Sequence, residues 1–184
     1  PVVVDSRPGA GMQIALEQTW AQPHDGQTII WMNQQYLSAI EAVDKSIPYA
    51  TDQWVWLEML QNDPVVIVVN AASPWNNLDA FVEDMRARPD TITVGLLVGS
   101  VQVLACKRLL EGILDVKFRE VPQTSGAAMR TAVVGGHLDA TCTNASETYA
   151  LGKDVRTLAV FNDAGTPLLP EAQTVNSYLK EKGK

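Results

Sequence analysis

The chain has 184 residues, of which 46% are hydrophobic and 19% are charged, so it can bury a substantial core and is not an intrinsically disordered segment. Its formal net charge of −7 argues against binding to nucleic acid or to anionic membrane surfaces, and an anionic ligand would have to be held by local donors. The longest apolar stretch, 64–69, is too short to cross a bilayer.

The first seventy residues predict several strands and one helix. Apolar residues at helical spacing predict a helix over 9–21, with Leu16 on its buried stripe. Short apolar runs indicate strands at 2–5, 28–33, 54–60 and 65–70. A strand, a helix and a strand joined by short connections imply a parallel βαβ unit at the start of the chain.

The rest of the chain alternates helices and strands. Asn77 is the expected N-cap of a helix that ends at Pro89, because apolar residues follow Asn77 at helical spacing. A second helix begins at Ser100, with Leu104 among its core-facing residues, and ends at Gly112. Further strands are expected at 92–95, 117–121, 138–143 and 155–161, followed by a polar tail at 166–184.

This alternation predicts an α/β protein with mainly parallel sheets, in which ligands bind beyond the carboxyl ends of the strands. Three loops at such ends, 32–37, 95–101 and 123–127, are rich in amide and hydroxyl side chains, which hydrogen-bond ligands but do no covalent chemistry unaided. The candidate ligand-binding residues in and beside these strand ends are Asn33, Gln34, Gln35, Gly99, Ser100, Val101, Gln123, Thr124, Ser125, Gly126, Ala127, Thr143 and Asn144.

The segment 121–144 is the most informative of these, because it reads as a strand, an amide-rich loop, a helix start and a second strand. Gly126 and Ala127 would open the helix, and its free N–H groups and positive dipole end would face the loop as a small-anion cradle. An ordinary βαβ connection without a ligand fits the segment, taken alone, better, and the rest of the chain favours the cradle.

Catalytic and metal-binding interpretations find little support in the sequence. His24 and His137 have no ligand-spaced partners, and Ser100 and Ser125 lack both a nearby histidine and a Gly-x-Ser-x-Gly context. We therefore expect no catalytic residue, no bound metal and no cofactor.

The two cysteines, Cys106 and Cys142, have neither metal-ligand nor Cys-x-x-Cys spacing. Both are expected at buried positions, Cys106 on a helix and Cys142 on a strand. We expect both to remain free thiols, with a disulfide as the alternative.

Several motifs occur in an order that resembles the tripartite tricarboxylate transporter receptors, the TctC/Bug family. They are VVVDSRPGAG at 2–11, PHDGQTII at 23–30, IPY at 47–49, VIVVN at 66–70, VP at 121–122, SGA at 125–127, GGHLD at 135–139 and RTLAV at 156–160. The resemblance spans nearly the whole chain. It implies two α/β lobes, a cleft between them, and a small carboxylate held by loop amides, hydroxyls and water. It also implies a first strand, loop and helix before Pro1, a loop that contributes to the site, and a further portion after Lys184.

The chain departs from the family pattern where ligand selectivity is expected. Hydroxyl side chains and a histidine of the family are replaced by aliphatic residues within 93–104, the Tyr-Lys-Gly loop becomes 123–125, and an Asp becomes Thr143. Fewer side-chain donors should weaken a site for a second carboxylate, while backbone donors remain. A monocarboxylate, an aromatic carboxylate or a ligand with an apolar tail then fits as well as the dicarboxylates that the resemblance implies.

The resemblance and the element pattern together predict an α/β, two-lobed periplasmic binding protein fold with mainly parallel sheets. Lobe one would comprise 1–70 and 161–184, and lobe two 71–160, with hinge crossings near Asn70 and Phe161. The expected function is that of an extracytoplasmic solute-binding protein, which captures a small carboxylate between the lobes and delivers it to a tripartite transporter.

The expected partners are a small carboxylate and the membrane permease of the transporter, with no nucleic acid, and the protein is expected to act as a periplasmic monomer with a signal peptide upstream. Two alternatives from other classes remain. One is a small α/β enzyme acting on carboxylates, and the other is the ligand-sensing domain of a signalling system. The lack of a convergent Lys, His or carboxylate pair favours binding over catalysis.

Overall fold

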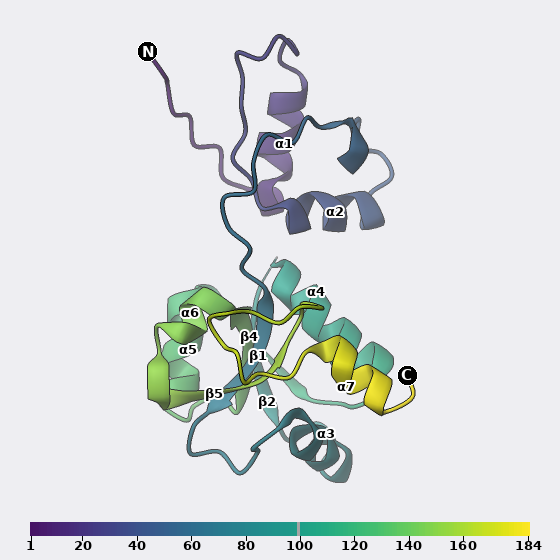
Figure 1. Ribbon diagram of the computed structural model, residues 1–184, viewed down its shortest axis with the longest axis vertical. Coiled ribbons are helices and arrows are strands. Elements are labelled where there is room, and N and C mark those ends of the chain that lie inside the picture. Colours follow the sequence, from purple (N-terminus) through teal and green to yellow (C-terminus); the bar gives the residue numbers. More distant parts are fainter. Residues whose placement is uncertain (99) are drawn as a thin grey trace. The chain divides into compact units, whose positions relative to one another are not determined.

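The computed structural model describes residues 1–98 and 100–184, with all of their side chains except those of 39, 43, 101 and 102. The chain divides into two compact units, Pro1–Leu60 (unit 1) and Gln61–Lys184 (unit 2) (Figure 1). The units and the predicted lobes have different boundaries, because 61–70 and 161–184 lie in unit 2. Among the described residues, no helix combines the length and the apolar character needed to span a membrane.

Unit 1 is a small helical unit with an aromatic core. Its helices are α1 (Gln13–Trp20) and α2 (Gln34–Val43), with short 3-10 turns η1 (Ala10–Met12) and η2 (Thr51–Gln53). Leu16, Leu37 and Tyr49 are its buried hydrophobic residues. Trp20 packs against Tyr49 and Trp54, with ring centroids 5.9 and 5.4 Å apart. The predicted burial of Leu16 on α1 is confirmed.

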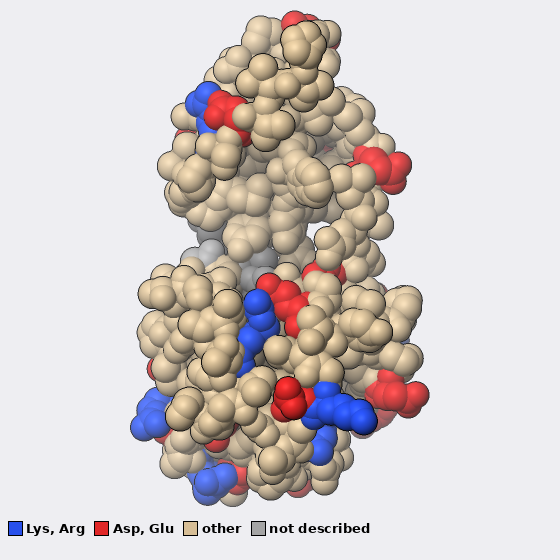
Figure 2. Space-filling model, turned by 90° about the vertical axis from the view of Figure 1, so that its left-hand side faces the viewer, with Lys and Arg blue, Asp and Glu red and all other residues tan. Residues whose placement is uncertain are grey.

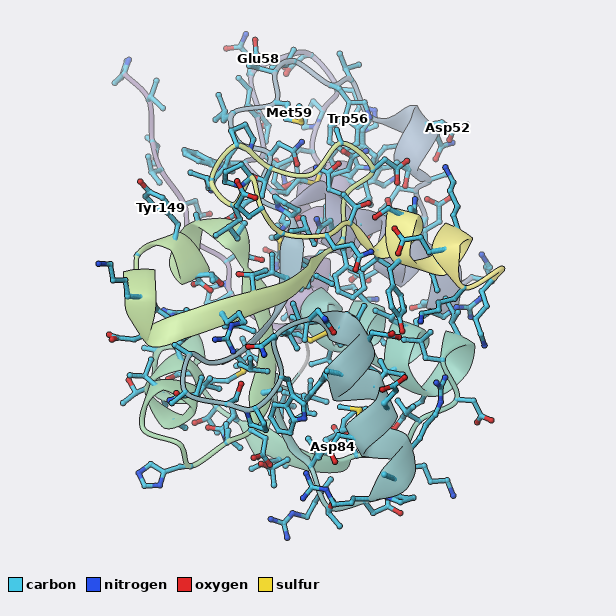
Figure 3. The ribbon with its side chains drawn as sticks, turned by 60° about the horizontal axis from the view of Figure 1, so that its bottom comes forward. Asp52, Trp56, Glu58, Met59, Asp84 and Tyr149 are labelled. Carbon is cyan, nitrogen blue, oxygen red and sulfur yellow. A yellow bond between two sulfur atoms is a disulfide. The ribbon has the colours of Figure 1, made fainter. Side chains whose placement is uncertain are left out.

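The strands expected in unit 1, at 2–5, 28–33 and 54–60, are absent from its described residues, and the predicted βαβ unit is wrong. Val3, Trp31 and Val55 are more than four-fifths exposed, at 87%, 83% and 86%. Trp56 and Met59, labelled in Figure 3, lie in the same 54–60 run as Val55 and are also exposed. These runs have a strand's composition, but a strand forms only where a neighbour accepts its backbone hydrogen bonds.

Unit 2 is built on a five-stranded sheet in the order β3-β2-β4-β1-β5. β2 pairs in parallel with β3 and β4, whereas β1 is antiparallel to both β4 and β5. Four strands therefore run in one direction and β1 alone is reversed, so the α/β class with a mainly parallel sheet is confirmed. The strands are β1 (Val65–Asn70), β2 (Thr93–Leu97), β3 (Arg119–Gln123), β4 (Ala140–Asn144) and β5 (Val155–Val160).

Helices cover both faces of this sheet (Figure 1). One face packs on α3 (Leu78–Ala87), α4 (Val101–Lys107), its π-helical continuation η3 (Arg108–Ile113) and α7 (Val175–Glu181). The other face packs on α5 (Gly126–Val134) and α6 (Ala145–Tyr149), and the 3-10 turn η4 (Gly152–Asp154) precedes β5. Alternate residues of β1 serve the two faces, because side chains alternate along a strand. Val65, Ile67 and Val69 join the larger core, and Val66 and Val68 the smaller one.

The helix predicted after Asn77 is confirmed as α3. The Asn77 side chain accepts a hydrogen bond from the Ala80 amide at 2.8 Å, as expected of an N-cap. Two predictions about helices are wrong. Leu104 on α4 is 53% exposed instead of buried, and the polar tail contains α7, capped by the Thr174 side chain and holding buried Tyr178.

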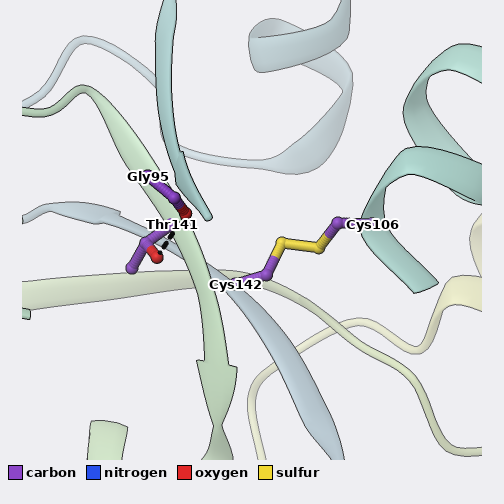
Figure 4. The surroundings of a disulfide bond; sticks show 4 residues. All are labelled: Gly95, Cys106, Thr141 and Cys142. Carbon is purple, nitrogen blue, oxygen red and sulfur yellow. Dashed lines mark hydrogen bonds between the residues drawn. A yellow bond between two sulfur atoms is a disulfide. The ribbon is translucent and has the colours of Figure 1, made fainter. Parts of the chain in front are cut away.

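Side-chain hydrogen bonds hold β2 against the beginning of β4. The Asp139 carboxylate accepts from the Thr93 backbone N–H at 2.7 Å and from the Thr93 hydroxyl at 2.6 Å. Two residues after Asp139, on β4, the Thr141 hydroxyl donates to the Gly95 carbonyl at 2.8 Å (Figure 4). Because Thr141 is buried, this bond removes the cost of an unpaired hydroxyl inside the sheet. These contacts set the level at which the strand ends lie.

The Asp84 carboxylate, labelled in Figure 3, should account for part of the protein's loss of stability in acid. It pairs with the Arg88 guanidinium and accepts from the Trp75 indole N–H at 2.8 Å, and these interactions, the Arg88 hydrogen bond first, lower the pKa of Asp84. A depressed folded-state pKa contributes stability that is present above the unfolded value, about 3.9, and is lost as the pH falls through the folded value. We expect Asp84→Asn to lose less stability than the parent between about pH 5 and pH 3 in urea titrations. The matched control is Asp90→Asn on an exposed loop, which should follow the parent; equal acid sensitivity of all three proteins would contradict the assignment.

Candidate functional site

The carboxyl ends of three neighbouring strands lie at the same edge of the unit 2 sheet. Leu97 at the end of β2 is in register with Gln123 at the end of β3. On the other side of β2, Gly95 is level with Thr141, so β4 ends beside β2 as well. The parallel arrangement thus brings two of the three predicted loops to one edge, as expected for an α/β sheet.

A cavity of about 150 Å³ lies at this edge. It brings together four of the predicted site residues, Ser100, Gly126, Thr143 and Asn144. The remaining lining residues are Leu97, Met129, Cys142 and Glu147. The walls are therefore partly polar and partly apolar, as is usual for pockets that hold small organic ligands.

The first turn of α5 leaves backbone donors beside this cavity. The Ser125 side chain accepts from the Ala128 amide at 3.1 Å, and the Ser125 carbonyl accepts from the Met129 amide at 3.1 Å. Among the contacts described, the amides of Gly126 and Ala127 have no acceptor, and Gly126 lines the cavity. These free amides at the positive end of the helix dipole are suited to an anion.

Ser100 supplies a second donor. The residue is 5% exposed, and among the described residues its hydroxyl has no hydrogen-bond partner. Its backbone N–H is used, because it donates to the Leu97 carbonyl at 3.2 Å. A buried hydroxyl without a partner costs about 1 to 3 kcal/mol, which a ligand acceptor can recover.

Glu147 is a site residue that the sequence analysis missed. It lies on α6, four residues after Thr143 on β4, and the Thr143 hydroxyl donates to the Glu147 Oε2 atom. The Arg130 Nη1 atom on α5 lies 2.7 Å from the same oxygen. The contact with Thr143 depends on how the chain turns from β4 into α6, and the approach of Arg130 depends on how α5 and α6 pack, so neither was visible in the sequence.

The other predicted residues do not line this cavity. Asn33, Gln34 and Gln35 are exposed at the start of α2 in unit 1, where the Asn33 side chain caps the helix by accepting from the Gln35 amide at 3.1 Å. Gln123 ends β3, Thr124 and Ser125 connect it to α5, and Ala127 lies in the first turn of α5 beside the lining residue Gly126. Gly99 and the side chain of Val101 lie outside the described residues.

The two cysteines form a disulfide, so the prediction of free thiols is wrong (Figure 4). Cys106 on α4 and Cys142 on β4 have Cα atoms 6.5 Å apart, and both are buried. The expected positions were correct, but burial does not distinguish a thiol from a disulfide. The bond ties α4 to the strand that lines the cavity, since Cys142 is one of its walls.

Neither surface charge nor the second hollow of unit 2 offers a competing site. Figure 2 shows basic and acidic side chains interspersed over the visible face of unit 2, without a field of one sign. A larger groove of about 540 Å³ runs beside β5 and includes Arg156 and Tyr149. The Arg156 guanidinium is already committed, because it donates to the carbonyls of Ala71, Ser73 and Trp75. Within 1–98 and 100–184, no three His, Cys, Asp or Glu side chains are grouped to hold a metal ion.

Comparison with known proteins places this geometry in context. A family model described as "Tripartite tricarboxylate transporter family receptor" matches residues 1–183. The "UPF0065 protein in tcbD-tcbE intergenic region" of Pseudomonas sp. (strain P51) is 26% identical over 177 residues, covering 95% of this chain and 52% of that protein. BugT of Bordetella pertussis is 25% identical over 179 residues, covering 95% and 55%. The chain thus spans about half the length of these relatives.

Solved structures give the same fold. MatC from Rhodopseudomonas palustris, with bound malate, aligns with a TM-score of 0.70 at 22% identity and covers 92% of this chain and 58% of its own. A TctC solute-binding protein from Polaromonas aligns with a TM-score of 0.57 at 30% identity, covering 66% and 41%. A protein of R. palustris with adipate aligns with a TM-score of 0.66 at 21% identity, covering 95% and 60%.

Proposed function

Because this chain belongs to the tripartite tricarboxylate transporter receptor family, we propose that it is part of a solute receptor that captures a small carboxylate at the unit 2 cavity. The observation that carries the proposal is the unpartnered Ser100 hydroxyl beside the free amides at the start of α5. Hydrogen bonds from such donors to a carboxylate are charge-assisted and contribute about 1.5 to 3 kcal/mol each. The malate and adipate in two structural neighbours support the same ligand class.

Delivery and location complete the proposal. The ligand is captured between two lobes, one formed by 1–70 with 161–184 and the other by 71–160. Asn33, Gln34 and Gln35 contribute to the site from the first lobe. A membrane permease recognises the closed monomeric form. We place the protein in the periplasm, after export by a signal peptide. The Cys106–Cys142 disulfide supports this location, because disulfides persist in oxidising compartments.

The alternatives have less support. The family is one of receptors, so a small α/β enzyme acting on carboxylates is set aside on that ground. A ligand-sensing domain would use the same cavity and differ only in the partner that reads its closed form.

The proposal predicts that small carboxylates, and not sugars or nucleotides, stabilise the protein. A ligand at a hundred times its dissociation constant stabilises the folded state by about 2.7 kcal/mol, which a thermal-shift screen resolves readily. Gly126→Val should abolish the shift, because a Cβ at Gly126 would lie 3.0 Å from the Arg130 Nη1 atom and the added methyl groups would crowd the cavity wall.

The matched control is Gly112→Val on η3, away from the cavity, where a Cβ meets only the Arg108 side chain at 3.9 Å. This variant should retain the parent's shift, with circular dichroism confirming that both variants fold. Stabilisation by sugars with none by any carboxylate would overturn the proposed ligand class. An unchanged carboxylate shift in folded Gly126→Val would overturn the location of the site.

A further inference from the structure

The ionisable side chain that lines the unit 2 cavity is acidic. Glu147 is the one ionisable side chain among the eight described lining residues. Its cation, Arg130, is not among them: the Arg130 Nη1 atom is fully buried and lies against Glu147 Oε2 at 2.7 Å. Arg130 therefore pairs with the Glu147 Oε2 atom next to the lining residue Gly126, while the Glu147 carboxylate forms part of the wall.

Donors and acceptors in the cavity are divided among different residues. The Thr143 hydroxyl donates its hydrogen bond to Glu147 Oε2, so towards a ligand its oxygen can only accept. The Glu147 Oε1 atom accepts no described hydrogen bond. The Ser100 hydroxyl and the Gly126 amide are lining donors without a described acceptor.

We propose that Glu147 determines specificity, so that the cavity takes a small monocarboxylate that carries a hydroxyl or amino donor and rejects a second carboxylate. This inference rests on the proposed function and names its substrate class. The ligand's carboxylate accepts from Ser100 and Gly126, and its donor group meets Glu147. A dicarboxylate would place a second carboxylate against the Glu147 Oε1 atom, where it would meet an acceptor instead of a donor.

The size of the cavity limits the part of the ligand that it holds. An engineered cavity of about 150 Å³ in another protein holds a benzene molecule, which sets a scale of about six to eight heavy atoms. The apolar walls Leu97 and Met129 suit a short methylene chain between the two polar ends. Four-carbon acids match both limits.

The test is isothermal calorimetry with a series that differs only in the substituent. The probes are butyrate, its 2-, 3- and 4-hydroxy derivatives, the corresponding amino acids, and succinate. We expect at least one donor-bearing acid to bind about tenfold or more tighter than butyrate, and succinate to bind at least about a hundredfold weaker than that acid. The hydroxy and amino arms identify which donor the site prefers.

Glu147→Gln supplies the second measurement. Glutamine keeps an oxygen for Thr143 and Arg130 and removes the anion, so the preference for the donor-bearing acid over succinate should fall at least about tenfold. The control is Glu111→Gln, an exposed glutamate on η3, which should leave the preference unchanged.

The outcomes separate this inference from the proposed function. If succinate binds the parent as tightly as every donor-bearing acid, or if folded Glu147→Gln keeps the parent's preference, the role of Glu147 is wrong while the carboxylate receptor stands. If no member of the series binds, the inference is overturned, and the wider carboxylate and sugar screen decides the proposed function separately.

Discussion

Replacing both Cys106 and Cys142 with Ala is expected to lower the free energy of unfolding of unit 2 by about 4 kcal/mol. The bond joins residues 36 apart in sequence, and a loop of this length restricts the unfolded chain by about that amount in the chain-entropy description. Alanine is used instead of serine because both positions are almost completely buried, where a serine hydroxyl would lack a partner. For a unit of this size the melting temperature should fall by roughly 15 °C.

Urea denaturation followed by circular dichroism measures this loss directly. Reducing agent added to the parent should reproduce most of it and should leave the double variant unaffected. Thiol labelling of the denatured, unreduced parent should find no free cysteine, because both are in the disulfide. Two labelled thiols in that sample, with an unchanged denaturation midpoint in the double variant, would show that the bond does not form in solution.

Phe81→Ala is expected to cost about 3 to 5 kcal/mol, the second large effect. Phe81 on α3 is fully buried in the larger core of unit 2. Its ring packs edge-on against Trp75, with centroids 5.0 Å apart, so the variant loses an aromatic pair as well as buried area. The cavity that remains cannot close without moving the sheet and α3 together.

The matched control is Leu104→Ala, which also truncates a large apolar side chain on a helix of unit 2 but at a position that is 53% exposed. It should change the free energy of unfolding by about 0.5 kcal/mol or less. Urea titrations of the parent and both variants make the comparison. A Phe81→Ala loss no larger than that of Leu104→Ala would mean that α3 does not pack on the sheet as described.

The sequence predicted best the features that local signals determine. Strand β1 was placed at its observed bounds because five consecutive β-branched residues precede Asn70. Helix α3 was predicted from its cap and its apolar spacing, which act within one or two turns. Ser100, Gly126, Thr143 and Asn144 were brought together by the general rule that strand ends of a parallel sheet meet at one edge.

The features that the sequence did not predict depend on contacts between distant residues. The runs around Trp31 and Val55 have the composition of strands, yet pairing requires a partner that composition does not specify. The disulfide depends on how α4 lies over β4, and the Arg130–Glu147 pair depends on how α5 lies beside α6. A signal for α7 was present, because Thr174 precedes a helical stretch, but its polar composition favoured a loop.

The position of β1 has a mechanical consequence. The strand begins four residues after the chain enters unit 2, and it is held by antiparallel ladders to β4 on one side and β5 on the other. A pull that arrives through the chain from Leu60 first meets Asp63 and Pro64, which accept from the Ser146 and Ala145 amides, and its component along β1 loads the hydrogen bonds of both ladders in shear. At the far end of the strand, the Asn70 side chain donates to the Val133 and Val134 carbonyls and anchors β1 to α5. Unit 2 should therefore resist force applied at this junction as one rigid body.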